Sequence, residues 1–225
     1  MFVRSRLDGS KVIRAVLNGE IVWRGYRYLY DDFSDPSLKS SLWDIFGGAF
    51  GTVTIVDGEC HIENTTGGHK ENLGISSKLT FPVGTTYRVR SKNPQGRHAS
   101  LIGFGNSPFT AYPHGAAGVG ITRYSRADIP NSVALSIEDD TNTTRYIDDV
   151  GETEDSREYA IYEMVRVSET VVELYRNGVL EATAANVAFA NDYPIFLAAD
   201  GWSNANQSTT TKIVIDWVEV IGPLE

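Results

Sequence analysis

Residues 171–182 read Val171-Val172-Glu173-Leu174-Tyr175-Arg176-Asn177-Gly178-Val179-Leu180-Glu181-Ala182. β-Branched, apolar and aromatic residues with a few charged ones between them flank the Asn-Gly pair on both sides. Such runs are typical of β-strands, in which successive side chains point to opposite faces of the sheet. Asn-Gly accepts the positive φ angles of a type I′ turn, so the stretch is predicted to form a β-hairpin.

The same chemistry recurs at two other places in the chain. Residues 12–17 and 20–23 flank Asn18-Gly19, and residues 52–56 and 59–62 flank Asp57-Gly58. Helical patterning is nearly absent, whereas β-branched and aromatic runs bounded by Gly, Asn, Asp and Pro recur along the chain. Further strands are predicted at 75–81, 86–91, 99–105, 117–124, 132–138, 158–167, 194–199 and 211–221.

The number and spacing of these strands predict an all-β fold, a two-sheet antiparallel jelly-roll sandwich preceded by an N-terminal β-hairpin. The run 212–221 is apolar on both faces, so we expect it to be a central strand. Residues 1–28 are predicted to form a separate hairpin or docking arm, and residues 29–225 the jelly-roll domain. A lone hairpin is only marginally stable, so this arm should pack on something else.

Composition limits the classes of fold and partner that the chain can have. With 225 residues and 41% hydrophobic side chains, one large β domain is the default expectation. The net charge of −9 and the pI near 5.0 exclude nucleic acid and anionic membranes as primary partners. Cys60 is the single cysteine, so no intrachain disulfide can form, and we expect it to be a small buried strand residue.

The N-terminal sequence begins Met1-Phe2-Val3-Arg4-Ser5-Arg6-Leu7 and has no apolar run of the length that a secretion signal needs. No other stretch is apolar enough to span a bilayer. We therefore expect a protein that is made and assembled in the cytoplasm of its host.

Three phrases resemble concanavalin A-like lectin/glucanase (LamG-like) domains. The first is Asp31-Asp32-Phe33-Ser34-Asp35, which leads to Trp43; the second is 162–167 followed by 172–179; the third is 215–220. The resemblance spans residues 30–222 and implies the jelly-roll fold, which hosts lectins, hydrolases, lyases and structural modules. It places Trp43 and Trp217 in strand phrases, where core positions are expected.

Residues 16–23, Val16-Leu17-Asn18-Gly19-Glu20-Ile21-Val22-Trp23, separately resemble short hairpins of tail and capsid-associated proteins of tailed phages. This resemblance implies that the hairpin docks onto a virion. Together with the missing export signal, it favours a glycan-binding fold carried on a particle that is released by lysis.

Catalytic motifs are not found. Glycosidic cleavage needs two carboxylates facing one cleft, and the glucanases that share this fold present them as an E-x-D-x-x-E strand, which does not occur here. The acidic clusters Glu138-Asp139-Asp140 and 148–155 lie in turn-rich sequence that is typical of solvated loops. A G-x-S-x-G nucleophile turn and a P-loop are also absent from the sequence, so we expect a protein that is not an enzyme.

Metal and sugar ligands remain candidates in the loops. Structural calcium would need hard oxygen ligands, which Asp139, Asp140 and Asn142 offer beside Glu138, or alternatively Asp200, Asn204 and Asn206. The four histidines lack a zinc-binding interval, and no other cofactor is expected. Sugars are recognised by stacking on aromatic rings and by polar groups that bind hydroxyls. The predicted glycan ligands are Trp202, Asp200, Asn204, Tyr112, His114, Tyr124 and Arg126.

These observations predict a non-catalytic virion protein of a phage tail or capsid, with a lectin-like domain for glycan binding, host adhesion or contacts between virion subunits. Its expected partners are other virion proteins, through the hairpin, and a host surface glycan, within a homo-oligomer or symmetric array. The alternative is a carbohydrate-active enzyme, either a glycoside hydrolase or a lyase, or its carbohydrate-binding module. A structural particle component without a ligand is a third reading.

Overall fold

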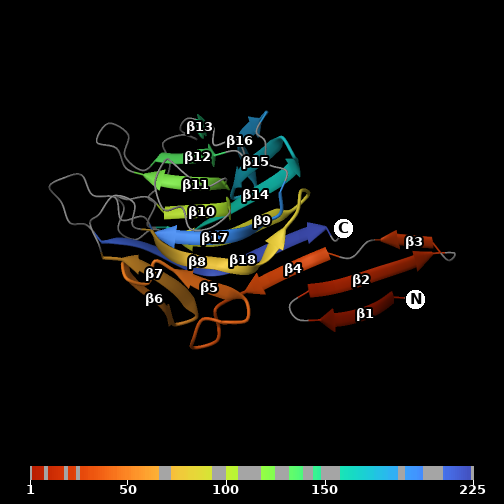
Figure 1. Ribbon diagram of the computed structural model, residues 1–225, viewed down its shortest axis with the longest axis horizontal. Coiled ribbons are helices and arrows are strands. Elements are labelled where there is room, and N and C mark those ends of the chain that lie inside the picture. The colour runs from red at the N-terminus through yellow and green to blue at the C-terminus, as the bar shows by residue number, and fades with distance from the viewer. Residues whose placement is uncertain are drawn as a thin grey trace.

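The computed structural model describes the chain as a set of β-strands that form three antiparallel sheets (Figure 1). The described residues are 2–7, 10–17, 20–23, 26–65, 72–92, 100–105, 118–124, 132–138, 144–147, 158–186, 191–199 and 210–223, with side chains described in 26–65, 72–92, 102–105, 158–186, 191–199 and 210–223. Within these ranges no helix has the length and apolar character needed to cross a membrane.

The first main sheet has eight strands in the order β16-β15-β14-β9-β18-β7-β6, and β4 pairs with the second half of β18. Its strands are β4 (Tyr26–Asp31), β6 (Gly51–Val56), β7 (Glu59–Asn64), β9 (Thr86–Lys92), β14 (Ala160–Ser168), β15 (Val171–Arg176), β16 (Val179–Ala185) and β18 (Thr211–Pro223).

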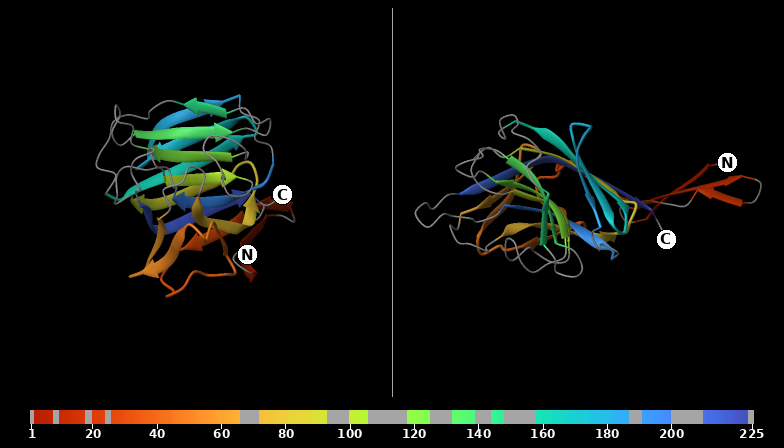
Figure 2. Two further views of the ribbon diagram at one scale, coloured as in Figure 1. Left: turned by 60° about the vertical axis from the view of Figure 1, so that its left-hand side comes forward. Right: turned by 90° about the horizontal axis from the view of Figure 1, so that it is seen from above.

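The second main sheet has seven strands in the order β13-β12-β11-β10-β17-β8-β5, which Figure 1 shows from top to bottom. Its strands are β5 (Trp43–Phe46), β8 (Leu73–Phe81), β10 (Ser100–Gly105), β11 (Gly118–Tyr124), β12 (Ser132–Glu138), β13 (Thr144–Ile147) and β17 (Tyr193–Ala199). Figure 2 shows the two main sheets as separate layers when the molecule is seen from above. The predicted two-sheet sandwich is confirmed.

The N-terminal strands form a small sheet of their own, β1 (Phe2–Leu7), β2 (Ser10–Leu17) and β3 (Glu20–Trp23). β2 and β3 are the two strands predicted around Asn18-Gly19, and β1 adds a third that the sequence pattern did not reveal. This sheet lies beyond the end of the sandwich, next to β4 (Figures 1 and 2). Whether it acts as a docking arm stays a prediction.

Two of the predicted tight turns lie in the described residues, and both have the expected backbone. Asp57 and Gly58 have φ angles of 54° and 79°, and Asn177 and Gly178 have φ angles of 49° and 81°. Positive φ at both central positions is the signature of a type I′ turn. The hairpins β6-β7 and β15-β16 are therefore set by local sequence.

β18 is the predicted central strand, because it pairs with β9 on one side and with β7 and β4 on the other. Ile213 and Ile215 enter the core, and so do Val218 and Val220. The spacing shifts by one residue at a β-bulge between Ile215 and Trp217. The bulge turns Trp217 out of the core, so that its side chain is partly exposed and the predicted core role of this tryptophan is wrong.

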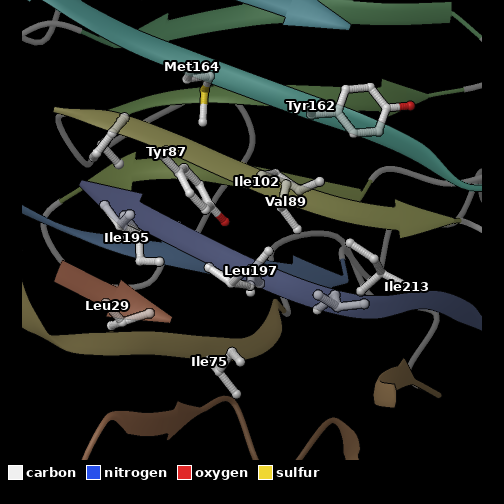
Figure 3. Packing of buried hydrophobic residues seen from close by; sticks show 14 of the residues in the cluster. Leu29, Ile75, Tyr87, Val89, Ile102, Tyr162, Met164, Ile195, Leu197 and Ile213 are labelled. Atoms are coloured by element: carbon white, nitrogen blue, oxygen red, sulfur yellow. The ribbon is translucent and has the colours of Figure 1, made fainter. Parts of the chain in front are cut away.

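The core lies between the two main sheets and is contiguous (Figure 3). Ile102, Ile195 and Leu197 of the seven-stranded sheet face Val89, Met164 and Ile213 of the eight-stranded sheet. Trp43 is 2% exposed and Cys60 is fully buried, as predicted. Tyr87 lies among these side chains and meets Phe104 edge-on, with the ring centroids 5.6 Å apart.

The charged residue Arg166 of β14 is fully buried and connects the two main sheets. Its Nη1 donates to the carbonyl oxygen of Phe81 at 2.7 Å, and its Nη2 donates to that of Asn191 at 2.8 Å. The guanidinium group also lies 5.4 Å from the ring centre of Tyr193 and 5.8 Å from that of Phe104. These contacts fix the positions of the end of β8 and the start of β17, two neighbouring strands of the seven-stranded sheet.

Candidate functional site

Most of the predicted ligand residues lie outside the described residues. Tyr124 is the last residue of β11, and its side chain is not among those described. The other predicted glycan ligands and the predicted calcium ligands lie outside the described ranges, and these predictions remain untested: Asp200, Trp202, Asn204, Tyr112, His114 and Arg126; Asp139, Asp140 and Asn142. Where side chains are described, no three of His, Cys, Asp and Glu gather closely enough to hold a metal ion.

The outer face of the seven-stranded sheet carries a regular row of positions. Residues directly opposite each other on paired strands share a face, so the register defines which residues lie side by side. One row crosses all seven strands, from the β5 edge to the β13 edge: Asp44, Ser76, Phe196, Gly103, Gly120, Ser136 and Tyr146. The row alternates with core residues such as Ile102 and Leu197, so it belongs to the face that points away from the core.

Two aromatic rings mark the β5 end of this face. Phe196 packs with Ala198 and the partly buried Phe46 in a small cluster that is separate from the main core. Phe46 lies over Gly74: a Cβ added at Gly74 would be 2.6 Å from Phe46 Cζ and 2.2 Å from the carbonyl oxygen of Leu197. Because Gly74 has no side chain, the ring of Phe46 can pack against the sheet beside Phe196.

The middle of the face consists of small residues. Gly103 and Gly105 of β10 pair with Gly120 and Gly118 of β11. Glycines add no side chain above the plane of the sheet, which permits another group to approach the backbone closely, and Gly103 and Gly105 are buried. The face therefore runs from an aromatic end into a strip of glycines.

Among the described residues, few charged ones lie on this face. Lys78 Nζ lies 3.3 Å from Asp44 Oδ1 at the exposed β5 edge. Among the residues of strands β10 to β13, one is acidic, Glu138, which pairs with Gly118 of β11 and Thr144 of β13. By register Glu138 lies on the outer face, in the row next to that of Ser136.

Sequence analysis did not identify Phe46, Phe196 or the facing glycines as site residues. Phe196 lies within Pro194-Ile195-Phe196-Leu197-Ala198-Ala199, which is apolar at every position. In such a run periodicity cannot separate the core face from the outer face. A usable signal was the run of small outer residues, since Gly103, Gly105, Gly118 and Gly120 occupy alternate positions of two predicted strands.

Known structures share this architecture over most of its length. A Bacillus licheniformis β-glucanase superimposes with a TM-score of 0.66 and 16% identity, covering 86% of this chain and 97% of that one. The catalytic domain of a Thermotoga petrophila endo-1,3-β-glucanase (laminarinase) gives 0.61 and 14%, covering 90% and 100%. The chain has the jelly-roll fold of the β-glucanases. A pseudo β-1,3-glucanase of Mycobacterium tuberculosis gives 0.61 and 13%, covering 87% and 98%. No family model and no curated protein sequence matches the chain.

This comparison corrects two predictions. The chain was expected to be a virion protein and not an enzyme, yet its structural neighbours are glycoside hydrolases, including endo-glucanases. They favour the alternative, a carbohydrate-active enzyme or its binding module. The prediction rested on the missing E-x-D-x-x-E phrase and on a hairpin of eight residues, whereas the shared fold covers 86–90% of the chain. The resemblance of that hairpin to phage proteins gains no support.

Proposed function

We propose that this chain is a carbohydrate-active enzyme that binds a β-linked glucan across the outer face of its seven-stranded sheet and cleaves it. The observation that carries the proposal is the arrangement of this face, with Phe46 and Phe196 at one end, a strip of glycines in the middle and Glu138 beyond it. The structural neighbours that are named as glucanases support the same reading.

The aromatic end suits a pyranose chain. The apolar face of a sugar ring stacks on an aromatic side chain, and Phe46 remains partly exposed for such a contact. Four facing glycines allow the next sugars to lie close to the backbone of β10 and β11. Three strand spacings separate Phe196 from the β12 position of Glu138, or roughly 14 Å, which a short run of sugars can span.

Glu138 is the proposed acid or base of the cleavage reaction. Hydrolysis of a glycosidic bond needs two carboxyl groups, roughly 5 to 10 Å apart, one of which protonates the leaving oxygen. Glu138 ends β12 on the outer face, and Asp139 and Asp140 follow it directly in the sequence. We propose that one of these two aspartates, or an acidic residue of 148–155, supplies the second carboxylate.

The test is cleavage of barley β-glucan and laminarin by the purified chain, measured as new reducing ends. Glu138→Gln should lower the rate at least about 100-fold, the usual effect of losing a general acid or base. Glu173→Gln is the matched control, because Glu173 lies on β15 in the other sheet, where it accepts a hydrogen bond from Tyr175. It should leave the rate unchanged.

Phe46→Ala tests the aromatic end separately, and it should raise KM more than it lowers kcat. A wild-type chain that cleaves neither these glucans nor other polysaccharides would overturn the enzymatic proposal. Retention by a glucan gel without cleavage would then leave the binding-module reading. A wild-type chain that neither binds nor cleaves would remove both.

A further inference from the structure

The β-bulge in β18 has placed a tryptophan on the outer face of the eight-stranded sheet. Ile213 and Ile215 alternate into the core, so a regular strand would send the side chain at position 217 inward as well. The bulge makes Val218 the next core residue and leaves Trp217 outside, opposite Arg90 of β9. Bulges re-aim side chains and are over-represented next to functional sites.

Two tyrosines lie on the same face beside this tryptophan. Tyr30 of β4 pairs with Glu219, two residues after Trp217, and Tyr28 pairs with Ile221. The rings of Tyr28 and Tyr30 are nearly parallel, at 13°, with centroids 6.5 Å apart. Tyr30 is 45% exposed, and it is the one aromatic residue among the exposed large hydrophobic side chains of the described ranges. Large aromatic side chains are more often packed in the interior than grouped on an outer face of a sandwich.

The polar groups between these rings are held in fixed positions. Glu219 Oε1 accepts a hydrogen bond from the Tyr28 hydroxyl at 3.4 Å, and its Oε2 accepts one from Arg88 Nη1, also at 3.4 Å. Arg88 also pairs through Nε with Glu163. Positive and negative charges thus alternate across the strands, which favours an uncharged ligand with many hydroxyl groups over a strongly charged one.

We infer that Trp217, Tyr30 and Tyr28, together with Glu219 and Arg88, form a second carbohydrate-binding surface, which takes the pyranose rings of a neutral polysaccharide. The rings supply stacking surfaces, and the carboxylate and guanidinium groups bind hydroxyls. This surface does not depend on the proposed cleavage site. The two main sheets pack face to face, so their outer faces point in opposite directions (Figure 2).

Bivalent binding is a further consequence, which rests on the proposed function: the two surfaces lie on opposite faces of the protein and can bind glucan at the same time. A long glucan, or two neighbouring chains of one, can then be held at both faces, and the second contact benefits from a high effective concentration. We expect the second surface to slow dissociation from polymeric glucan while it contributes little to the binding of short oligosaccharides at the first face.

The experiment is affinity electrophoresis in native gels that contain barley β-glucan or laminarin, with Glu138→Gln in every variant to prevent cleavage. Trp217→Ala and Tyr30→Ala should each weaken retention about fivefold, as expected for the loss of one stacking contact. Trp217→Phe keeps a ring and should retain most of the binding. The matched control is Tyr175→Ala, which removes an aromatic ring from β15 of the same sheet, four strands away from β4.

A second readout is tryptophan fluorescence during titration with laminarihexaose at high concentration. The wild-type emission maximum should shift on binding. The Trp217→Phe protein should lose the part of the shift that comes from Trp217. Unchanged retention of Trp217→Ala, or equal losses for Trp217→Ala and Tyr175→Ala, would overturn the inference. Gel filtration adds a third test. If the wild type is a dimer and Trp217→Ala is a monomer with unchanged glucan binding, a second copy of the chain covers this surface and the inference is overturned. Phe46→Ala, run alongside, reports on the first face alone.

Discussion

The indole Nε1 of Trp43 donates a hydrogen bond of 2.8 Å to the carboxylate of Asp31, and both residues are buried. The other carboxylate oxygen accepts from Lys39 Nζ at 2.7 Å and from the backbone N–H of Phe33 at 3.2 Å. Phe33 has a φ of 50°, which this network stabilises. The phrase that opens the predicted jelly roll therefore serves the fold, by joining the end of β4 to the start of β5.

Asp31→Asn should lower the free energy of unfolding by about 3 kcal/mol, because it removes a buried charge that serves three donors. Urea denaturation followed by fluorescence measures this loss. The control is Asp35→Asn, since Asp35 also pairs with Lys39, at 3.3 Å, but is 59% exposed. It should cost less than about 0.5 kcal/mol. Equal effects of the two substitutions would contradict the role assigned to Asp31.

Tyr87→Phe should stabilise the protein. The Tyr87 hydroxyl is fully buried, where burial raises its pKa well above the usual value, and it has no hydrogen-bond partner in the described structure. An unsatisfied buried hydroxyl costs roughly 1 to 3 kcal/mol, so its removal should raise the free energy of unfolding by about 1 kcal/mol. Tyr193→Phe is the control, because its hydroxyl accepts a hydrogen bond from Asn191. A loss of stability in Tyr87→Phe would contradict this prediction and would indicate a bound water molecule that forms a hydrogen bond with the hydroxyl.

Gly74→Ala should destabilise the protein by about 3 kcal/mol and weaken glucan binding as well. The added methyl group would overlap the Leu197 carbonyl oxygen and the ring of Phe46, so both β17 and the aromatic end of the site must move. Thermal unfolding and affinity electrophoresis measure the two effects. Gly48→Ala provides the comparison, because a Cβ there meets nothing within 4 Å. Its stability should stay within about 0.5 kcal/mol of wild type.

Cys60 should not react with thiol reagents at pH 8 until the chain unfolds. Burial, with a smaller effect of Asp31, raises the pKa of the Cys60 thiol to about 12. A raised pKa means that the folded state favours the neutral thiol, so this contribution to stability is fully present below the usual value near 9 and is lost as the pH rises toward 12. Wild type should therefore lose more stability than Cys60→Ala between pH 9 and 12. Rapid labelling of the native protein at pH 8 would refute this.

The parts of the fold that were predicted from sequence are those set by local chemistry. Asn177-Gly178 and Asp57-Gly58 impose their turns through φ angles that few other residue pairs accept, so hairpins could be placed without tertiary information. The central position of β18 followed from its apolar run. β5 escaped prediction because Trp43-Asp44-Ile45-Phe46 is too short to show a period, and it becomes a strand by pairing with β8.

The candidate site depends on register, which the sequence does not reveal. Phe196 and Gly103 are 93 positions apart and meet because β17 pairs with β10. Trp217 shows the same limitation, because alternation from Ile215 predicts a core position, and the bulge that reverses it becomes visible only when β9 is paired alongside. Side-chain pattern fixes which residues can be strands, whereas long-range pairing decides which residues become neighbours.

The position of β18 in both the sequence and the sheet also constrains how the protein is made. This strand completes the pairing of β4, β7 and β9, and its contacts with β4 join residues that are almost two hundred positions apart. Partners so distant are slow to find each other. The sheet cannot close while residues 211–223 are still on the ribosome. Until then, the nascent chain exposes the open edges of β7 and β9, so its yield in cells should depend on chaperones that shield such edges during translation.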